Sequence, residues 1–153
     1  VQSLASHGFD RVVVVNGHGG NIAALREVTG TITRHDDAYA VPFTWFEAVG
    51  DHRAEMGHAG PLETALLRHV HPDLVREERI EEARAGASDR WGDWEDRVNL
   101  AYDVAEFTEN GVIGDPADGG ADRGEILLEL ARDALVELLV AVETRDTARP
   151  PHR

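Results

Sequence analysis

A run of four valines that enters a glycine-rich loop is the feature that most constrains how this chain folds. The segment VVVVNGHGGNIAAL covers residues 12–25 and holds one histidine, His18. The short apolar run 11–15 is bounded by turn residues, which is typical of a strand buried on both faces in a parallel sheet. Open α/β sheets bind ligands at such loops, between the end of a strand and the start of a helix. The pattern therefore predicts a site loop with His18 directed into a cleft, made of Asn16, Gly17, Gly19, Gly20 and Asn21 around it.

After this loop, the pattern of apolar residues predicts helices and strands in alternation. Residues 22–34 have near-helical apolar spacing at Ile22, Leu25, Val28 and Ile32. Residues 38–46 are β-rich, with Pro42 indicating an edge position or a bulge. Helices are predicted at 61–70, which opens with a proline, and at 125–142. This alternation predicts a layered α/β domain.

The helix predicted at 125–142 is the most amphipathic segment of the chain. Its expected buried residues are Leu127, Leu130, Ala131, Leu135, Leu138 and Val142. The charged, turn-rich segment 77–94 instead suits a solvent-facing excursion or flap. In this segment Trp91 and Trp94 either anchor the loop or cover a pocket, and we favour anchoring.

Length and composition set the domain organisation. A chain of 153 residues with 42% hydrophobic content can bury one ordinary core, so we predict one domain over 1–145 and a frayed tail over 146–153. No apolar run has the length of a membrane span, and the first residues do not resemble a signal peptide. We therefore expect a cytoplasmic protein with no membrane partner.

The charge balance is strongly acidic, with 15 Lys and Arg against 29 Asp and Glu and a net charge of −14. All 15 cations are arginines. Nucleic acid is disfavoured as a partner, because phosphate binding needs a basic stripe. The charge favours a surface adapted to high salt, where counter-ions screen self-repulsion, over one that selects a cationic partner. Without cysteine, any metal must be held by His, Asp or Glu.

A second histidine lies in another small-residue loop, GHAGPLET, at 57–64. His58 is followed five residues later by Glu63, in the first turn of the helix that Pro61 opens. A carboxylate there is favoured by the helix N-terminus and can serve as a cap or as a metal ligand. Together with His18, the pair suggests a hydrolytic metal centre.

A phosphate-binding role for the first loop is the competing interpretation. The dinucleotide fingerprint requires a third glycine where this chain has Ile22, and a nucleotide P-loop requires a lysine that the chain lacks. A nucleotide-binding α/β domain therefore remains an alternative that the motif itself does not favour.

The sequence resembles the creatininase family of metal-dependent amidohydrolases in NGHGGN (16–21), HAGPLET (58–64), and GVIGDP with RGE (111–116, 123–125). The resemblance implies a three-layer α/β/α fold with a mostly parallel sheet and a centre of two divalent ions, Zn, Mn or Fe. It implies hydrolysis of a non-peptide C–N bond in a small amide, cyclic amide or formamide, and assembly as a homo-oligomer. By position, His18 and Glu63 are implied as metal ligands, and His58 as the catalytic residue that passes a proton to the leaving nitrogen.

Departures from the family pattern bear on substrate. Creatininases carry a tyrosine and a catalytic glutamate where this chain has Gly19 and Gly20, and a tryptophan where it has Ala54. These differences argue against creatinine itself as the substrate. The glycine form of the loop is similar to relatives that deformylate a pyrimidine intermediate and to those that trim the mycofactocin precursor peptide.

The family also places a Glu-x-His pair and a bridging aspartate ahead of the region that this chain resembles. Residues 2–7 are expected to be the end of a helix capped by Gly8, which suggests that an upstream segment is missing, although a valine start codon would also explain it. The pair Asp51 and His52 is expected to be a surface turn rather than a substitute. We thus expect the carboxyl-terminal part of a family member, with a non-catalytic subunit or binding module as the alternative.

Overall fold

The computed structural model describes residues 1–35 and 38–148. The chain divides into two compact units, one formed by residues 1–48 with those from 131 onward, and one formed by residues 49–130. From residue 149 onward, the predicted tail lies outside the described residues, and residues 145–148 have no regular structure. A single domain over 1–145 stays a prediction.

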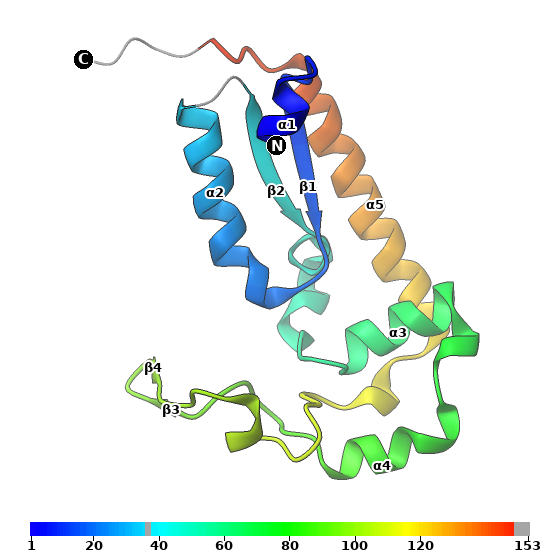
Figure 1. Cartoon of the computed structure of the whole chain (residues 1–153). Coiled ribbons are helices and arrows are strands. Elements are labelled where there is room, and N and C mark those ends of the chain that lie inside the picture. The colour runs from blue at the N-terminus through cyan, green and yellow to red at the C-terminus, as the bar shows by residue number, and fades with distance from the viewer. Residues whose placement is uncertain (36–37, 149–153) are drawn as a thin grey trace. The chain divides into compact units, whose positions relative to one another are not determined.

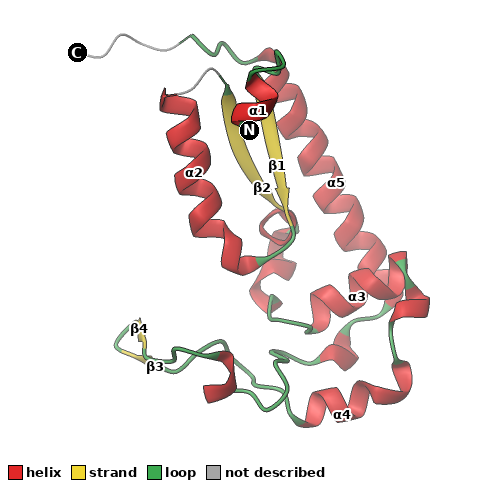
Figure 2. Ribbon diagram, viewed as in Figure 1, coloured by secondary structure: helices red, strands yellow, loops and turns green. Residues whose placement is uncertain are grey.

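The first unit is built on a parallel β-α-β crossover (Figures 1 and 2). After α1 (Gln2–Ala5), strand β1 (Arg11–Asn16) leads to helix α2 (Ile22–His35) and strand β2 (Tyr39–Thr44). The strands pair in parallel, with Arg11 opposite Tyr39 and Asn16 opposite Thr44. The helix ends at Ala5 with Ser6 as its cap, earlier than the predicted end at Gly8, and a turn over residues 6–8 follows. Gly8 ends this turn with its φ at +89°, a conformation that glycine adopts without steric cost.

Helices lie on both sides of this strand pair. Figure 1 shows the strands between α2 and the carboxyl-terminal part of α5 (Ala121–Thr144). Ile32 of α2 is buried with Ala38 and Ala40. At the start of β1, the Arg11 guanidinium donates to the Val142 carbonyl at 3.0 Å, which fixes the end of α5. The layering that positions the His18 loop is therefore local to this unit.

Burial in the first unit differs from the sequence prediction. The β1 residues are mostly half-buried rather than fully buried, and Val15 is 61% exposed. Val28 is also exposed, whereas α2 buries Thr29 and Ile32. The reason is that, among the described residues, the sheet has only two strands and thus offers a narrow surface for packing. Among the described residues both β1 and β2 are edges of this sheet, so the edge position or bulge expected from Pro42 stays a prediction.

The second unit contains the predicted helix α3 (Pro61–Val70), the short helix α4 (Ile80–Ala85) and the hairpin of β3 (Trp94–Glu95) with β4 (Val98–Asn99). Short 3₁₀ turns connect these elements at Gly50–Glu55, Pro72–Leu74, Glu77–Arg79, Val104–Glu106 and Pro116–Asp118. The core of this unit consists of Val49, Leu62, Ala65, Val112, Ile113 and Leu127.

The segment expected to be an excursion is therefore partly helical, since it contains α4. Its tryptophans support the anchoring interpretation. The Trp91 ring lies 5.7 Å from that of Phe107, and the Trp94 indole N–H donates to the Trp91 carbonyl at 2.6 Å. Both rings remain about half exposed, at 48% and 47%.

Helix α5 begins at Ala121, four residues before the predicted start. Leu127, Ala131 and Val142 are buried as predicted. Leu130 was predicted to be buried but is 41% exposed, and Leu135 and Leu138 are half-buried. The helix has apolar residues on more than one face, so periodicity alone does not identify its buried side. Among the described residues, no helix combines the length and apolar character needed to cross a membrane.

Backbone-to-backbone contact at glycines holds the second unit together. A Cβ at Gly57 or Gly60 would overlap the Ile113 carbonyl, and one at Gly124 would overlap the Ala65 carbonyl. The GVIGDP and RGE segments therefore pack directly on the loop and helix that carry His58 and Glu63.

A largely buried arginine also links these segments. Arg123, in the first turn of α5, is 18% exposed and binds both carboxylate oxygens of Glu55, at 2.9 and 3.0 Å. Its other terminal nitrogen contact is with His52 Nδ1 at 3.4 Å. The Arg123 hydrogen bond holds the pKa of Glu55 below its usual value, against the opposing effect of partial burial.

Replacing glycine by alanine should have opposite effects on stability at Gly124 in α5 and at Gly30 in α2. Gly124→Ala should lower the free energy of unfolding by about 1–3 kcal/mol, because the added methyl group overpacks the backbone of α3. Gly30→Ala in α2 should raise it by about 0.5–1 kcal/mol, because that methyl group meets only the Arg34 side chain at 3.5 Å and alanine favours helix. Urea unfolding followed by circular dichroism measures both, and stabilisation by Gly124→Ala would refute the close packing.

The Glu55 ion pair predicts a specific pH dependence. Because the folded-state pKa is lowered, the pair stabilises the fold fully above about pH 4.5, and this contribution is lost as the pH falls through the folded pKa. Glu55→Gln should therefore destabilise the protein at pH 6–7 by about 1 kcal/mol, with the difference from the unsubstituted protein shrinking towards pH 3. Glu82→Gln, in a more exposed pair, is the control and should cost less. A pH-independent difference would contradict this account.

Candidate functional site

The first predicted site loop is organised by one buried side chain, Asn16, which is 3% exposed. Its amide group donates to the His18 carbonyl at 2.9 Å and to the Thr44 hydroxyl at 3.1 Å. Its side-chain oxygen accepts from the His18 N–H and from the Asn21 amide, both at 3.2 Å. Asn16 thus ties the loop to itself and to the end of β2, which fixes the backbone of His18.

The His18 side chain lies over a glycine. His18 has an extended backbone and precedes the 3₁₀ turn Gly19–Asn21. A Cβ placed at Gly20 would be 2.7 Å from the His18 Nε2 atom, whereas one at Gly17 would meet nothing within 4 Å. The absence of a side chain at Gly20 therefore provides the space that the exposed imidazole occupies.

The second predicted site loop is fixed by the strand-like segment at Ile113. The His58 N–H donates to the Ile113 carbonyl at 3.0 Å, and the Ile113 N–H donates to the His58 carbonyl at 2.8 Å. At the next residue, Ala59, the chain takes a φ of +47°, which is uncommon for a residue with a side chain. The Ala59 N–H then donates to the Glu63 carboxylate at 2.6 Å. Glu63 therefore holds the turn that presents His58.

His58 and Glu63 lie next to each other. The His58 Nδ1 atom is 3.8 Å from a Glu63 carboxylate oxygen, and the side chains are 46% and 30% exposed. Glu63 is in the first turn of α3, where the helix dipole favours a negative charge. The arrangement places a group that can exchange a proton beside a carboxylate that can bind a cation, both accessible to solvent.

The structure brings together two of the three predicted functional side chains. His58 and Glu63 belong to the unit of residues 49–130, and His18 belongs to the unit that contains β1 and β2. Across residues 1–35 and 38–148, no three His, Asp or Glu side chains gather into a group that could hold a metal ion.

The sequence did not indicate that Glu55 pairs with Arg123, or that His52 lies beside the same arginine. Asp51 and His52 lie in the 3₁₀ turn Gly50–Glu55, where His52 is half-buried beside Arg123 rather than in a simple surface turn. Arg123 and Glu55 are separated by 68 positions. No local spacing signals such a pair, although the arginine belongs to the RGE motif.

The chain is similar to curated proteins named mycofactocin precursor peptide peptidase. It is 35% identical to the protein of Mycolicibacterium smegmatis (strain ATCC 700084 / mc(2)155) over 122 residues, covering 79% of this chain and 45% of the relative. It is 37% identical to that of Mycobacterium tuberculosis (strain ATCC 25618 / H37Rv) over 123 residues, covering 74% of this chain and 41% of the relative. The chain therefore spans less than half the length of these relatives.

Solved creatininase structures share the fold. A creatininase structure described by its Mn content gives a TM-score of 0.66 at 22% identity, covering 95% of this chain and 61% of that one. A Zn–Zn form of a creatininase mutant gives a TM-score of 0.63 at 23% identity, covering 95% and 60%. These likenesses confirm the predicted creatininase-like α/β fold.

The family model for creatinine amidohydrolase matches residues 1–139, which is most of the chain and includes every motif discussed above. The family members named in these comparisons are hydrolases. This chain belongs to the creatininase family.

Proposed function

We propose that this chain contributes to the active site of a metal-dependent hydrolase that cleaves an amide-type C–N bond. The observation that carries the proposal is the placement of the His58 imidazole 3.8 Å from the Glu63 carboxylate, on a loop held by Glu63 itself. Membership of a hydrolase family supports the reaction class. Because the chain spans less than half of its curated relatives, activity is proposed for the whole protein.

Divalent metal is the proposed cofactor. The His18 imidazole and the Glu63 carboxylate fit Zn, Mn or Fe by donor type, and creatininase structures exist in Mn and Zn–Zn forms. Two donors do not complete a coordination sphere, so these residues would supply only part of a two-ion centre. Such ions activate water near neutral pH and stabilise developing negative charge.

His58 is the proposed proton donor to the leaving nitrogen. An imidazole changes protonation near neutral pH, which suits general acid catalysis. The two backbone hydrogen bonds with Ile113 keep its Cα in place, and the half-exposed side chain remains open to a substrate. Glu63 is the proposed metal ligand and also positions the His58 loop.

Two substrate classes follow from different observations. The family description favours a small cyclic amide, and the resemblance of the glycine-rich loop to deformylating relatives suggests a formamide. The 35–37% identity to mycofactocin precursor peptide peptidases favours a peptide amide bond. Parallel assays on a formamide, a cyclic amide and a peptide would separate them. A homo-oligomeric assembly is proposed from the family resemblance.

Metal affinity tests the proposed ligands directly. His18→Ala and Glu63→Gln should each weaken Zn²⁺ or Mn²⁺ binding by about tenfold or more, because each removes a donor. Glu63→Gln can still accept the Ala59 N–H bond, so the fold should persist. His35→Ala, at an exposed position at the end of α2, is the control. Calorimetric titration and metal analysis give the affinities. Unchanged affinity in both test variants would favour the non-catalytic binding module.

The space around His18 gives a second test. Gly20→Ala should displace the imidazole, because its Cβ would lie 2.7 Å from Nε2, and should weaken metal binding by about tenfold with little loss of stability. Gly17→Ala adds the same methyl group to the same loop in open space and should leave affinity unchanged. Titration with Co²⁺, followed by absorption, compares the two. Equal Co²⁺ affinities of the two variants would show that the space at Gly20 for the His18 imidazole does not affect metal binding.

A further inference from the structure

Two largely buried arginines of the second unit, Arg123 in α5 and Arg68 in α3, make ion pairs of similar form. Their side chains are 18% and 13% exposed. Arg123 binds both carboxylate oxygens of Glu55, and Arg68 binds both of Glu77. Each carboxylate is more than half exposed. The two pairs can therefore be compared directly.

The two arginines differ in how completely their donors are used. Arg68 binds Glu77 from Nε and Nη2, and its Nη1 donates to two backbone carbonyls of the turn 116–119, at 3.2 and 2.6 Å. Arg123 binds Glu55 from Nη1 and Nη2, and within the described part of the chain its buried Nε–H has no hydrogen-bond partner. A buried donor without a partner lowers stability. Stability alone therefore explains Arg68 better than it explains Arg123.

The carboxylate that Arg123 binds lies at the end of the turn that leads to His58. Glu55 is the last residue of a 3₁₀ turn, and the Met56 N–H closes this turn on one of its carbonyls at 3.0 Å. Two residues separate Glu55 from His58. Residues 53–55 are exposed, so burial contributes little to fixing them. The contact with Arg123 thus restrains the chain just before His58.

The residue after Arg123 contacts the helix that carries Glu63. Gly124 packs directly on the Ala65 carbonyl of α3, and Ala65 lies two residues after Glu63. Two consecutive residues of α5 therefore contact both parts of the candidate site in this unit: Arg123 the segment that leads to His58, and Gly124 the helix that carries the carboxylate beside it.

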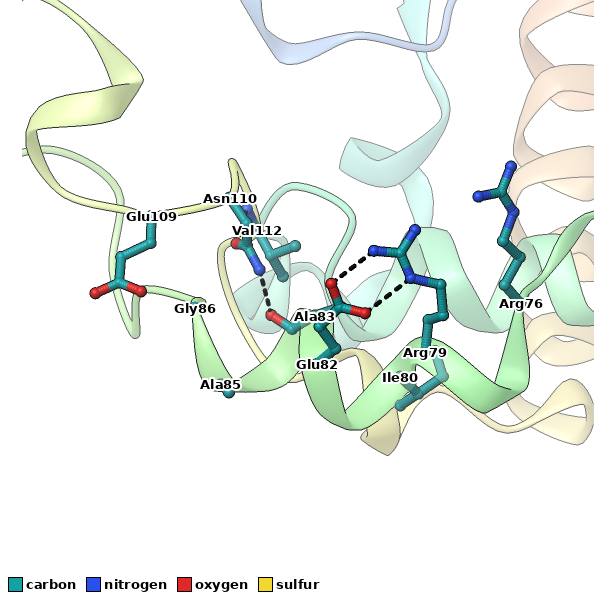
Figure 3. Close-up of a pocket in the computed structure, with 10 residues that line it drawn as sticks. All are labelled: Arg76, Arg79, Ile80, Glu82, Ala83, Ala85, Gly86, Glu109, Asn110 and Val112. Carbon is teal, nitrogen blue, oxygen red and sulfur yellow. Dashed lines mark hydrogen bonds and ion pairs between the residues drawn. The ribbon is translucent and has the colours of Figure 1, made fainter.

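The Arg79–Glu82 pair in Figure 3 is an ordinary surface pair of the same unit. The guanidinium binds both carboxylate oxygens at 2.6 and 2.8 Å, and both side chains are more than half exposed. These residues are three positions apart, so their pair stays within one helical segment. The Arg123–Glu55 pair instead joins residues 68 positions apart and can hold one element against another.

We propose that Arg123 is a positioning residue for His58. Its hydrogen bonds to Glu55 restrain the segment before His58 and keep the imidazole beside the Glu63 carboxylate, 3.8 Å away. The proposal rests on the proposed function for the role of His58 as proton donor, whereas the restraint itself can be measured without any reaction. A small displacement of a group that transfers a proton is enough to slow the step it serves.

Amide hydrogen exchange in Arg123→Met tests the restraint. Methionine keeps an unbranched side chain and removes the guanidinium, and Glu55 is exposed enough to be solvated alone. Exchange at Met56, His58 and Ala59 should become about tenfold faster, as expected for a local opening, while exchange in α3 and in the later turns of α5 stays nearly unchanged. A purely stabilising arginine would instead raise exchange throughout the unit by one common factor, which would overturn the proposal.

Arg68→Met is the matched control, because it removes an arginine of similar burial that also binds a carboxylate. It leaves two carbonyls of residues 116–119 without their donor, so it should lower the urea midpoint more than Arg123→Met does. Exchange at residues 56–59 should then change only in step with the rest of the unit. Adding Glu55→Gln to Arg123→Met should cause no further increase there, since both remove the same contact. A further increase would contradict the proposed route through Glu55.

Hydrolysis rates distinguish this proposal from the proposed function. With the whole, metal-loaded protein and the formamide, cyclic amide and peptide assays, Arg123→Met should lower kcat about tenfold and leave KM nearly unchanged. Arg123→Lys should recover part of the loss, because it keeps the charge without the two-pronged geometry. If the unsubstituted protein hydrolyses none of the three, the proposed function fails, and exchange still decides whether Arg123 restrains the His58 segment. An unchanged kcat in Arg123→Met would overturn the positioning role.

Discussion

The reciprocal backbone hydrogen bonds between His58 and Ile113, at 2.8 and 3.0 Å, are the contact on which the rest of the second unit depends. They form only because Gly57 and Gly60 bring no side chain against the Ile113 carbonyl. With Ile113 in place, the segment that follows can reach α3. Gly124 then lets the first turn of α5 approach the Ala65 carbonyl. Glycine spacing thus determines the packing of this unit as much as apolar burial does.

The loops that carry His18 and His58 are both fixed at their main chain, but by different hydrogen bonds. In the first unit, the buried Asn16 side chain fixes His18 through hydrogen bonds to both its backbone N–H and its backbone carbonyl. In the second unit, backbone pairing fixes His58, and the Glu63 carboxylate closes the turn. Side-chain-to-backbone bonds of this kind stabilise loops whose glycines would otherwise cost conformational entropy. Each imidazole is therefore held by its main chain while its ring stays accessible.

The sequence is sufficient to predict those features of this fold that depend on local chemistry. Pro61 marks the start of α3 because its fixed φ suits the first helical turn. Leu130 was wrongly predicted to be buried, because helical periodicity identifies an apolar face but not which of its residues another element covers. The Arg123–Glu55 pair, 68 positions apart, depends on the packed tertiary structure.

For the candidate site, sequence identifies the residues but not their mutual geometry. The spacing of His58 and Glu63 predicts that both lie near the start of α3, since five residues cannot separate them far. It does not predict that Glu63 accepts the Ala59 N–H, because this requires Ala59 to take a positive φ. That conformation is stable here because the surrounding bonds compensate for its cost. The same bond gives Glu63 a structural role beside any role as a ligand.

Part of the acidic composition serves to pair the arginines of this chain. With 29 acidic residues and 15 arginines, this chain has about two carboxylates for each guanidinium. Many arginines use that surplus, as in Arg68 with Glu77, Arg84 with Asp115 and Arg123 with Glu55. Within residues 1–35 and 38–148, the exposed side chains of Arg76, Arg90 and Arg97 form no ion pair, although an acidic residue is next to each of them in sequence. Ion pairs therefore form where the fold brings a carboxylate to a partly buried guanidinium, as at Arg68 and Arg123, and not wherever an acidic residue is near in sequence.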